Sequence, residues 1–108
     1  MRLVFDPKAL EHLRFWTETD RRKALQILDL IDATAKNPFE GIGKPEPLRF
    51  DLAGAWSRRI DQEHRLVYRI EKDELRVLSC RYHHSSIGLS VKSKNYVIPN
   101  ASVAQRNE

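Results

Sequence analysis

The stretch "HRLVYRIEKDELRVLSCRYHH", residues 64–84, decides the fold because it reads as a β-hairpin. The segments "HRLVYRI" and "LRVLSCRYH" are rich in strand-forming residues, and the charged "KDE" between them is typical of a turn. We therefore predict two adjacent antiparallel strands. The register of this hairpin determines which side chains share a face of the sheet.

The length of the turn sets the register. A turn of three residues, 72–74, pairs Arg65 with Arg81. One face would then carry mainly basic and small residues, namely Arg65, Val67, Arg69, Val77, Ser79, Arg81 and His83. The other face would supply the core, with Leu66, Tyr68, Ile70, Leu78, Cys80 and Tyr82. A turn of even length would mix the two sets, so the odd turn is our prediction.

The residues before this hairpin predict a strand and two helices. "RLVF" reads as a first strand, after which Asp6 can cap a helix that opens at Pro7. "TETD" breaks that helix, and Thr19 or Asp20 can cap a second one with an apolar stripe at the 3.6-residue period. The second helix cannot run past Asn37, because a proline follows.

Together these elements predict an α+β domain of residues 1–84. "LRFDL" and "AWSRRI" add two strands to the hairpin, giving the order β-α-α-β-β-β-β, an antiparallel sheet with both helices packed on one face. Residues 85–108 are rich in Ser and Asn and lack a sustained period, so we predict a poorly ordered C-terminal tail, in which "NYVIP" could form a short added strand.

Length and composition narrow the class of protein. A chain of 108 residues with one cysteine is enough for one compact domain and excludes an internal disulfide framework. The sequence has no apolar run that would span a membrane and no signal-peptide core, so we expect a cytoplasmic protein.

The net charge of the chain is +4. Arginines within the strands predict a basic sheet surface that suits a phosphate backbone, with an ordinary solvated face as the alternative. These arginines are Arg58, Arg59, Arg65, Arg69, Arg76 and Arg81.

Glu46, Arg65 and His83 together fit the chemistry of RNA cleavage through the 2′-hydroxyl group. This reaction needs a base for the 2′-OH proton, a cation for the charge on the phosphorane, and an acid for the departing 5′ oxygen. The nucleophile belongs to the substrate, so neither a metal nor a cofactor is required. Glu46 lies between two prolines, which should hold Lys44 and Glu46 in extended conformations; the alternative is an ordinary surface glutamate.

The remaining histidines and the cysteine give weaker signals. His83 and His84 are neighbours on a strand and point to opposite faces, so they do not easily share a metal. Cys80 lies on the predicted core face and reads as a small hydrophobic residue. We expect His12 on a helix surface and His64 at the start of a strand, each without a role.

Four sequence blocks, "GKPEPL", "WSRRI", "EHRLVY" and "CRYH", occur in this order within residues 1–84. With them the chain resembles the YoeB (Txe/YoeB) toxins of bacterial type II toxin–antitoxin systems, in the RelE/ParE superfamily. The resemblance implies a RelE-like ribonuclease fold and an mRNA interferase that cuts mRNA in the ribosomal A site and so inhibits translation. It also implies three partners: the mRNA and rRNA of the ribosome, a cognate YefM (Phd-like) antitoxin, and a second copy of the toxin in a homodimer.

The same resemblance assigns roles to the three candidate residues. It makes Glu46 the general base, His83 the general acid and Arg65 the group that stabilises the transition state. The candidates for binding or positioning RNA are Lys44, Arg49, Arg59, Arg81 and His84. His84 stands where the family usually ends in a tyrosine, a ring that can stack on a base.

Two alternatives to a nuclease remain. One is a non-catalytic inhibitor on the same fold that binds the ribosome or DNA gyrase. The other is a decayed toxin that binds only its antitoxin, which His84 and the additional residues 85–108 would fit. The joint presence of Glu46, Arg65 and His83 favours the nuclease.

Overall fold

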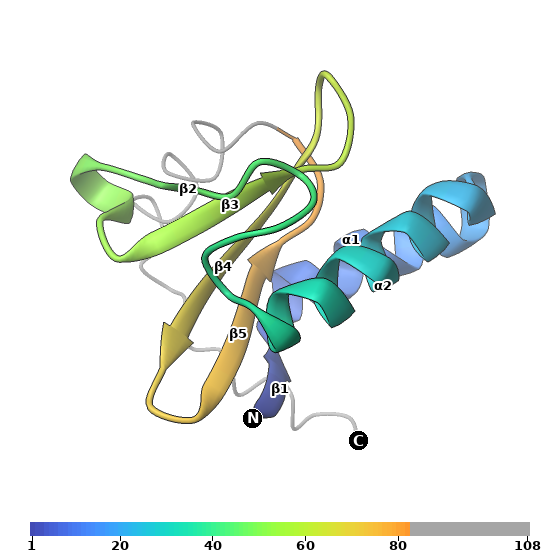
Figure 1. Cartoon of the computed structure of the whole chain (residues 1–108). Coiled ribbons are helices and arrows are strands. Elements are labelled where there is room, and N and C mark those ends of the chain that lie inside the picture. The colour runs from blue at the N-terminus through green and yellow to red at the C-terminus, as the bar shows by residue number, and fades with distance from the viewer. Residues whose placement is uncertain (83–108) are drawn as a thin grey trace.

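The computed structural model describes residues 1–82 (Figure 1). His83, His84 and the predicted tail therefore lie outside the described residues. The described elements are β1 (Arg2–Phe5), α1 (Pro7–Thr19), α2 (Arg21–Lys36), β2 (Glu46–Pro47), a 3₁₀ turn η1 (Phe50–Leu52), β3 (Ala55–Arg59), β4 (Arg65–Glu71) and β5 (Glu74–Ser79).

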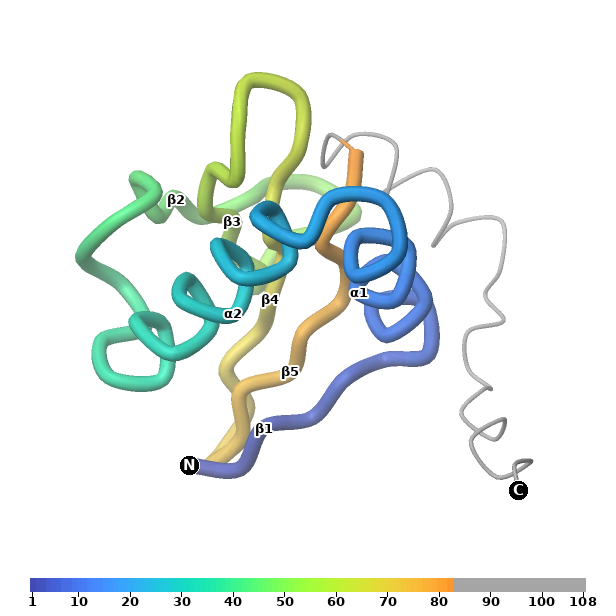
Figure 2. Tube along the Cα trace, turned by 90° about the vertical axis from the view of Figure 1, so that its right-hand side faces the viewer, coloured from blue at the N-terminus to red at the C-terminus, as the bar shows by residue number. Residues whose placement is uncertain are grey.

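The strands form one five-stranded sheet in the order β1-β5-β4-β3-β2, and α1 and α2 lie together on one of its faces (Figures 1 and 2). The predicted α+β class and the placement of both helices are confirmed. One detail differs, since the sheet is mixed. Strand β1 pairs with β5 in parallel, whereas the other neighbours are antiparallel. The meander from β2 to β5 brings the last strand beside the first in the same direction.

The helix termini follow the sequence signals except at Asp6. The side chain of Asp20 accepts a hydrogen bond from the backbone nitrogen of Lys23 at 3.1 Å, which caps α2 as predicted. Helix α2 ends at Lys36, also as predicted. Asp6 makes no side-chain bond to the amides of α1, so its predicted capping role is wrong. Its Oδ1 instead accepts a hydrogen bond from Nη1 of Arg76 at 2.8 Å.

Two apolar clusters lie on opposite faces of the sheet. The larger cluster fills the space between the helices and the sheet and contains Ala9, Trp16, Ala24, Ile27, Leu30, Ile31, Ile60, Leu66, Tyr68, Leu75, Val77 and Cys80. The smaller one comprises the buried Leu52, Ala55 and Val67, with Leu48 and Leu78 packed against them. The second cluster lies on the face away from the helices, which we call the open face.

The hairpin turn is shorter than predicted. Glu71 pairs with Glu74, so only two residues form the turn, and the first of them, Lys72, has a φ of 55°. A positive φ is typical of the tight turns that join two-residue hairpins. Consequently Val77 pairs with Tyr68 and belongs to the main core, whereas we had placed it on the opposite face.

A bulge then shifts the register by one residue. Val67 pairs with Ser79, while its neighbour Tyr68 pairs with Val77, so Leu78 is the additional residue. Leu78 packs in the smaller cluster on the open face rather than in the main core where we had predicted it. Beyond the bulge the register is the predicted one, because the pair Val67 and Ser79 belongs to the same register as a pair of Arg65 and Arg81. The turn that led to this prediction is nevertheless wrong.

Two other sequence predictions are wrong. "LRFDL" is not a strand, because β2 contains only Glu46–Pro47 and the 3₁₀ turn follows. Phe50 within this turn has a φ of 54° and is 90% exposed, which interrupts an extended run. Tyr82 was predicted for the core but is 42% exposed.

Within residues 1–82, neither helix has the length and apolar content that a membrane crossing needs.

Candidate active site

The loop that carries Glu46 is fastened to the sheet by Arg58, whose side chain is fully buried. The guanidinium group donates hydrogen bonds to three backbone oxygens, those of Asn37 at 2.6 Å, Glu40 at 3.0 Å and Ile42 at 3.0 Å. Its Nε also donates to the hydroxyl of Tyr68 at 3.3 Å. Arg58 therefore does not belong to a basic surface, as we had predicted; it fixes the start of the loop.

The end of the loop requires a glycine. Gly43 has a φ of +84°, and a Cβ there would lie 3.0 Å from Cδ2 of Leu30 and 3.1 Å from Cβ of Arg58. Its carbonyl accepts a hydrogen bond from the backbone nitrogen of Arg59 at 2.7 Å. Lys44, next in the chain, has a φ of 49° and is not extended as predicted. The loop turns at Lys44 before the chain enters β2.

Glu46 lies on the open face of the sheet. It pairs with Ser57, and Ser57 pairs with Val67, a member of the smaller apolar cluster. Residues that face each other across paired strands share a face, so the Glu46 side chain projects from the side opposite the helices. Glu46 is exposed, and its carboxylate has no hydrogen-bond or ion-pair partner within residues 1–82. Its extended conformation is as predicted.

Arg65 lies on the same face, two residues before Val67 on β4. Its Nη1 donates hydrogen bonds to carbonyl oxygens of the preceding turn, to Asp61 at 2.7 Å and to His64 at 3.1 Å. Nε and Nη2 have no protein partner in the described part of the chain. One side of the guanidinium group is therefore fixed while the other is free to bind an anion. Standard sheet spacings put the Cα atoms of Glu46 and Arg65 about 12 Å apart.

Three more candidate cations are exposed, and their side chains have no partner among residues 1–82: Lys44, Arg49 and Arg59. Arg59 pairs directly with Arg65 across β3 and β4. Arg69 and Arg76, by contrast, each have acidic neighbours, with Glu71 within 4 Å of both. The basic surface is consequently smaller than we predicted.

Arg81 does not lie opposite Arg65 on the open face, contrary to our prediction. Its guanidinium carbon is 3.5 Å from the centre of the Phe15 ring on α1 and 4.5 Å from that of Tyr82. The Nε atom is buried and has no hydrogen-bond partner among the described residues. The reason is that β5 ends at Ser79, after which the chain turns toward α1.

His12 and His64, for which we expected no role, are both buried. Nδ1 of His12 accepts a hydrogen bond from the backbone nitrogen of Cys80 at 3.2 Å, and Nδ1 of His64 accepts one from that of Tyr82 at 2.8 Å. Helical spacing could have revealed His12, because it lies three residues after Ala9 and four before Trp16, both in the core. No comparable pattern surrounds His64.

Burial, together with the positive charges of Lys8 and Arg81, lowers the pKa of His12 from 6.5 to about 4. The unfolded chain therefore binds a proton at His12 at a higher pH than the folded chain. The stability that neutral His12 contributes is fully present above pH 6.5 and is lost as the pH falls through about 4.

We expect His12 to account for about 2 kcal/mol of lost unfolding free energy between about pH 7.5 and about pH 5. His12→Asn keeps an acceptor in place of Nδ1 but does not titrate, so its loss over this interval should be about 2 kcal/mol smaller. Urea unfolding of both proteins at the two pH values measures the difference. Equal losses would mean that His12 titrates alike in the folded and unfolded states.

Burial raises the pKa of Cys80 to about 12, so this thiol is protonated at neutral pH and is no nucleophile. Its place in the core agrees with the prediction. Within the described residues, no group of three or more His, Cys, Asp or Glu side chains is arranged to hold a metal ion. The groups that strand pairing places on the open face without an acidic partner among residues 1–82 are the carboxylate of Glu46 and the guanidinium groups of Arg59 and Arg65.

The fold and this open face define the class: a small α+β toxin of the RelE type, an architecture it shares with solved bacterial toxin structures. More specifically, the chain belongs to the family described as the YoeB-like toxins of bacterial type II toxin–antitoxin systems, whose family model matches residues 5–84. The resemblance found in the sequence is thereby confirmed.

Individual relatives agree. The chain is 55% identical over 80 residues to Toxin YoeB of Mycobacterium bovis, which covers 74% of this chain and 94% of the relative. A solved YoeB/ParE toxin from Agrobacterium tumefaciens superimposes with a TM-score of 0.75 at 47% identity, covering 77% of this chain and 99% of that one. YoeB of Staphylococcus aureus, 38% identical over 77% of this chain and 97% of its own, was solved as a dimer (TM-score 0.72) and in a heterotetrameric YoeB-YefM complex (TM-score 0.71).

Proposed function

We propose that this toxin is a ribosome-dependent endoribonuclease that cleaves mRNA in the A site and so inhibits translation. The observation that carries the proposal is that Glu46 and Arg65 project from the same open face. The carboxylate of Glu46 and two guanidinium nitrogens of Arg65 have no hydrogen-bond or ion-pair partner within residues 1–82. Membership of the YoeB family supports the same activity.

In this mechanism Glu46 removes the proton from the 2′-hydroxyl group of the substrate. The 2′ oxygen then attacks the adjacent phosphorus, and the bond from phosphorus to the 5′ oxygen breaks. The free nitrogens of Arg65 stabilise the charge that develops on the phosphorane oxygens. His83 gives its proton to the departing 5′ oxygen. The RNA supplies its own nucleophile, and the reaction requires neither metal nor cofactor.

The openness of the site accounts for a dependence on the ribosome. Glu46 and Arg59 face solvent, where water weakens every electrostatic contact with the substrate. Docking onto ribosomal RNA would exclude that water and hold the mRNA in line for attack. Lys44, Arg49 and Arg59 would contact the phosphates of mRNA or rRNA, and His84 would stack on a base.

The solved relatives support two protein partners. The YoeB-YefM complex and the YoeB dimer of S. aureus support a YefM-like antitoxin and a homodimer as partners of this chain. Substrate and partners together imply an action in the cytoplasm, where ribosomes translate.

Mapping of mRNA 5′ ends by primer extension in a purified translation reaction tests the proposal. The full chain should produce new 5′ ends at A-site codons only when ribosomes are present, and a YefM-like antitoxin should suppress them. Arrest of translation without new 5′ ends would contradict the nuclease and favour a toxin that only binds the ribosome. A parallel reaction with a chain that ends at His84 measures what residues 85–108 contribute.

A further inference from the structure

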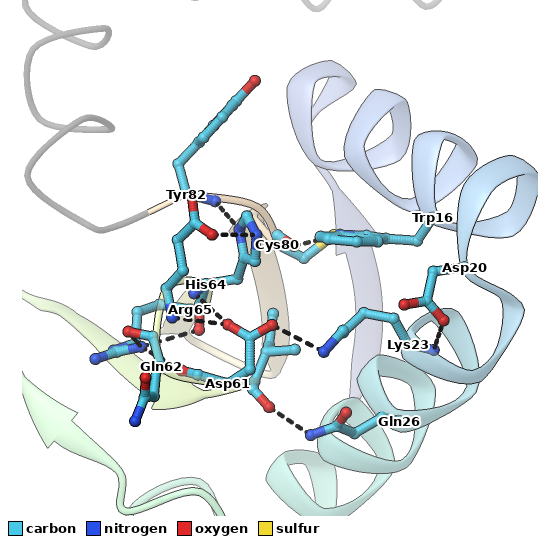
Figure 3. Close-up of polar contacts among 12 residues, drawn as sticks. Trp16, Asp20, Lys23, Gln26, Asp61, Gln62, His64, Arg65, Cys80 and Tyr82 are labelled. Carbon is cyan, nitrogen blue, oxygen red and sulfur yellow. Dashed lines mark hydrogen bonds and ion pairs between the residues drawn. The ribbon is translucent and has the colours of Figure 1, made fainter.

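The backbone of Tyr82 is bound on both sides by two consecutive residues of the β3–β4 region (Figure 3). Its nitrogen donates to Nδ1 of His64 at 2.8 Å, and its carbonyl oxygen accepts from the backbone nitrogen of Arg65 at 3.1 Å. Tyr82 has a φ of 72°, a conformation that L-residues rarely adopt without support. The two hydrogen bonds supply that support, and we call them the Tyr82 clamp.

The clamp selects the tautomer of the neutral His64 ring. Because Nδ1 accepts the Tyr82 N–H, it carries no proton, so the ring proton lies on Nε2. Nε2 is 3.5 Å from a carboxylate oxygen of Glu63, which favours a proton at that position. The imidazole thus acts as an oriented acceptor for the backbone.

His64 is itself held in place from the helical layer. Its ring packs against that of Trp16 in a T-shaped arrangement, with the ring centres 4.9 Å apart. Its backbone nitrogen donates to Oδ1 of Asp61 at 2.6 Å, and Oδ2 of Asp61 accepts from Nζ of Lys23 on α2 at 2.8 Å (Figure 3). The contacts therefore run from α2 through Asp61 and His64 to Tyr82.

The segment that leads into Tyr82 is braced in the same way. Nε1 of Trp16 donates a hydrogen bond to the carbonyl oxygen of Cys80 at 2.9 Å, and Nδ1 of His12 accepts one from the backbone nitrogen of Cys80. Cys80 therefore holds the chain to α1, whereas the Tyr82 clamp connects it to the strand that begins at Arg65.

We propose that His64 is a positioning residue for the cleavage reaction: through the clamp it fixes the backbone of Tyr82, the residue before the proposed acid, against Arg65. The inference rests on the proposed nuclease function, in which Arg65 and His83 act on the same phosphate. The carbonyl of Tyr82 belongs to the peptide group whose nitrogen is that of His83. The residue that precedes the proposed acid is thus joined, through the hydrogen bond at its carbonyl, to the backbone of the residue proposed to stabilise the phosphorane.

The size of the effect follows from the geometry of proton transfer. The acid must lie within hydrogen-bond reach of the 5′ oxygen, and a displacement of about 1 Å lowers a rate by roughly 100-fold. Loss of the His64 acceptor leaves the part-buried Tyr82 N–H without the partner that it has now, so the backbone at Tyr82 is expected to shift. Substrate affinity should change little, since His64 is buried beneath the open face.

His64→Leu and His64→Asn separate positioning from folding. Leucine removes the acceptor, whereas Oδ1 of asparagine can accept from Tyr82 in place of Nδ1. With full-length proteins, ribosome-dependent cleavage is measured under single-turnover conditions over a range of ribosome concentrations. Hydrogen exchange of the Tyr82 amide reports on the clamp. Urea unfolding at the assay temperature establishes that all variants are folded under the conditions of the cleavage assay.

We expect His64→Leu to lower the maximal rate about 10- to 100-fold, with a half-saturating ribosome concentration near that of the parent. The Tyr82 amide should exchange faster in this variant, and His64→Asn should regain most of both the rate and the protection. Equal maximal rates for the parent and folded His64→Leu would overturn the inference, as would a His64→Asn variant that is as slow as His64→Leu. A parent chain that does not cleave at all would instead show that the proposed function is wrong.

Discussion

Glu46→Gln is expected to lower the rate of ribosome-dependent mRNA cleavage by about 10²- to 10⁴-fold, because an amide cannot take the 2′-hydroxyl proton. Stability should stay within about 0.5 kcal/mol of the parent, since the carboxylate is exposed and has no partner within residues 1–82. Single-turnover cleavage and urea unfolding of the same preparations measure both effects.

Glu40→Gln is the matched control. Glu40 is an exposed glutamate in the same loop, and among residues 1–82 its carboxylate makes only a 3.5 Å contact with Asn37. The same loss of charge at this position should leave the cleavage rate near that of the parent. If both substitutions lowered the rate equally, the effect would come from the charge of the loop and Glu46 would not be the general base. If neither did, the base would have to be sought elsewhere.

Arg58→Met should lower the unfolding free energy by about 3 to 5 kcal/mol. Methionine fills part of the volume but leaves three backbone carbonyls, those of Asn37, Glu40 and Ile42, without the donor that now serves them. Urea unfolding near neutral pH measures the loss. Because these carbonyls anchor the loop before β2, surviving folded protein should also cleave mRNA more slowly than the parent.

Arg69→Met provides the comparison for Arg58. Arg69 lies on the open face, partly exposed, with a 3.4 Å hydrogen bond to the carbonyl of Ala53 and a 3.7 Å contact with Glu71. Exposed contacts of this kind contribute little, so the loss of unfolding free energy should remain below about 1 kcal/mol. Similar losses at the two positions would mean that the buried hydrogen bonds of Arg58 are not what stabilises the loop.

Much of the fold could be predicted from local signals. Helix ends followed from Asp20 and from the proline after Asn37, and the strand segments other than "LRFDL" from their composition. The turn and the bulge could not be predicted in this way. They depend on whether Val77 or Leu78 fills the core beneath the helices, which is a matter of packing in three dimensions.

The candidate site was predictable to a different degree at each residue. Glu46 and Arg65 were identified by chemistry and by resemblance, and their common face follows from strand pairing. Arg58 could have been assigned to the core, because alternation along "AWSRRI" places it with Trp56 and Ile60. His64 could not, since its importance lies in one bond to the backbone of a residue 18 positions away.

The pairing of β1 with β5 has a consequence for biosynthesis. Arg2 is translated among the first residues, yet its partner in the sheet is Glu74, and the core needs Leu75 and Val77 from the same late strand. A nascent chain that stops before Leu75 has no edge for its first strand and no closed core. Fragments from aborted translation should therefore stay unfolded and be degraded, so the toxin that we propose to act on ribosomes becomes competent only once its own synthesis has passed β5.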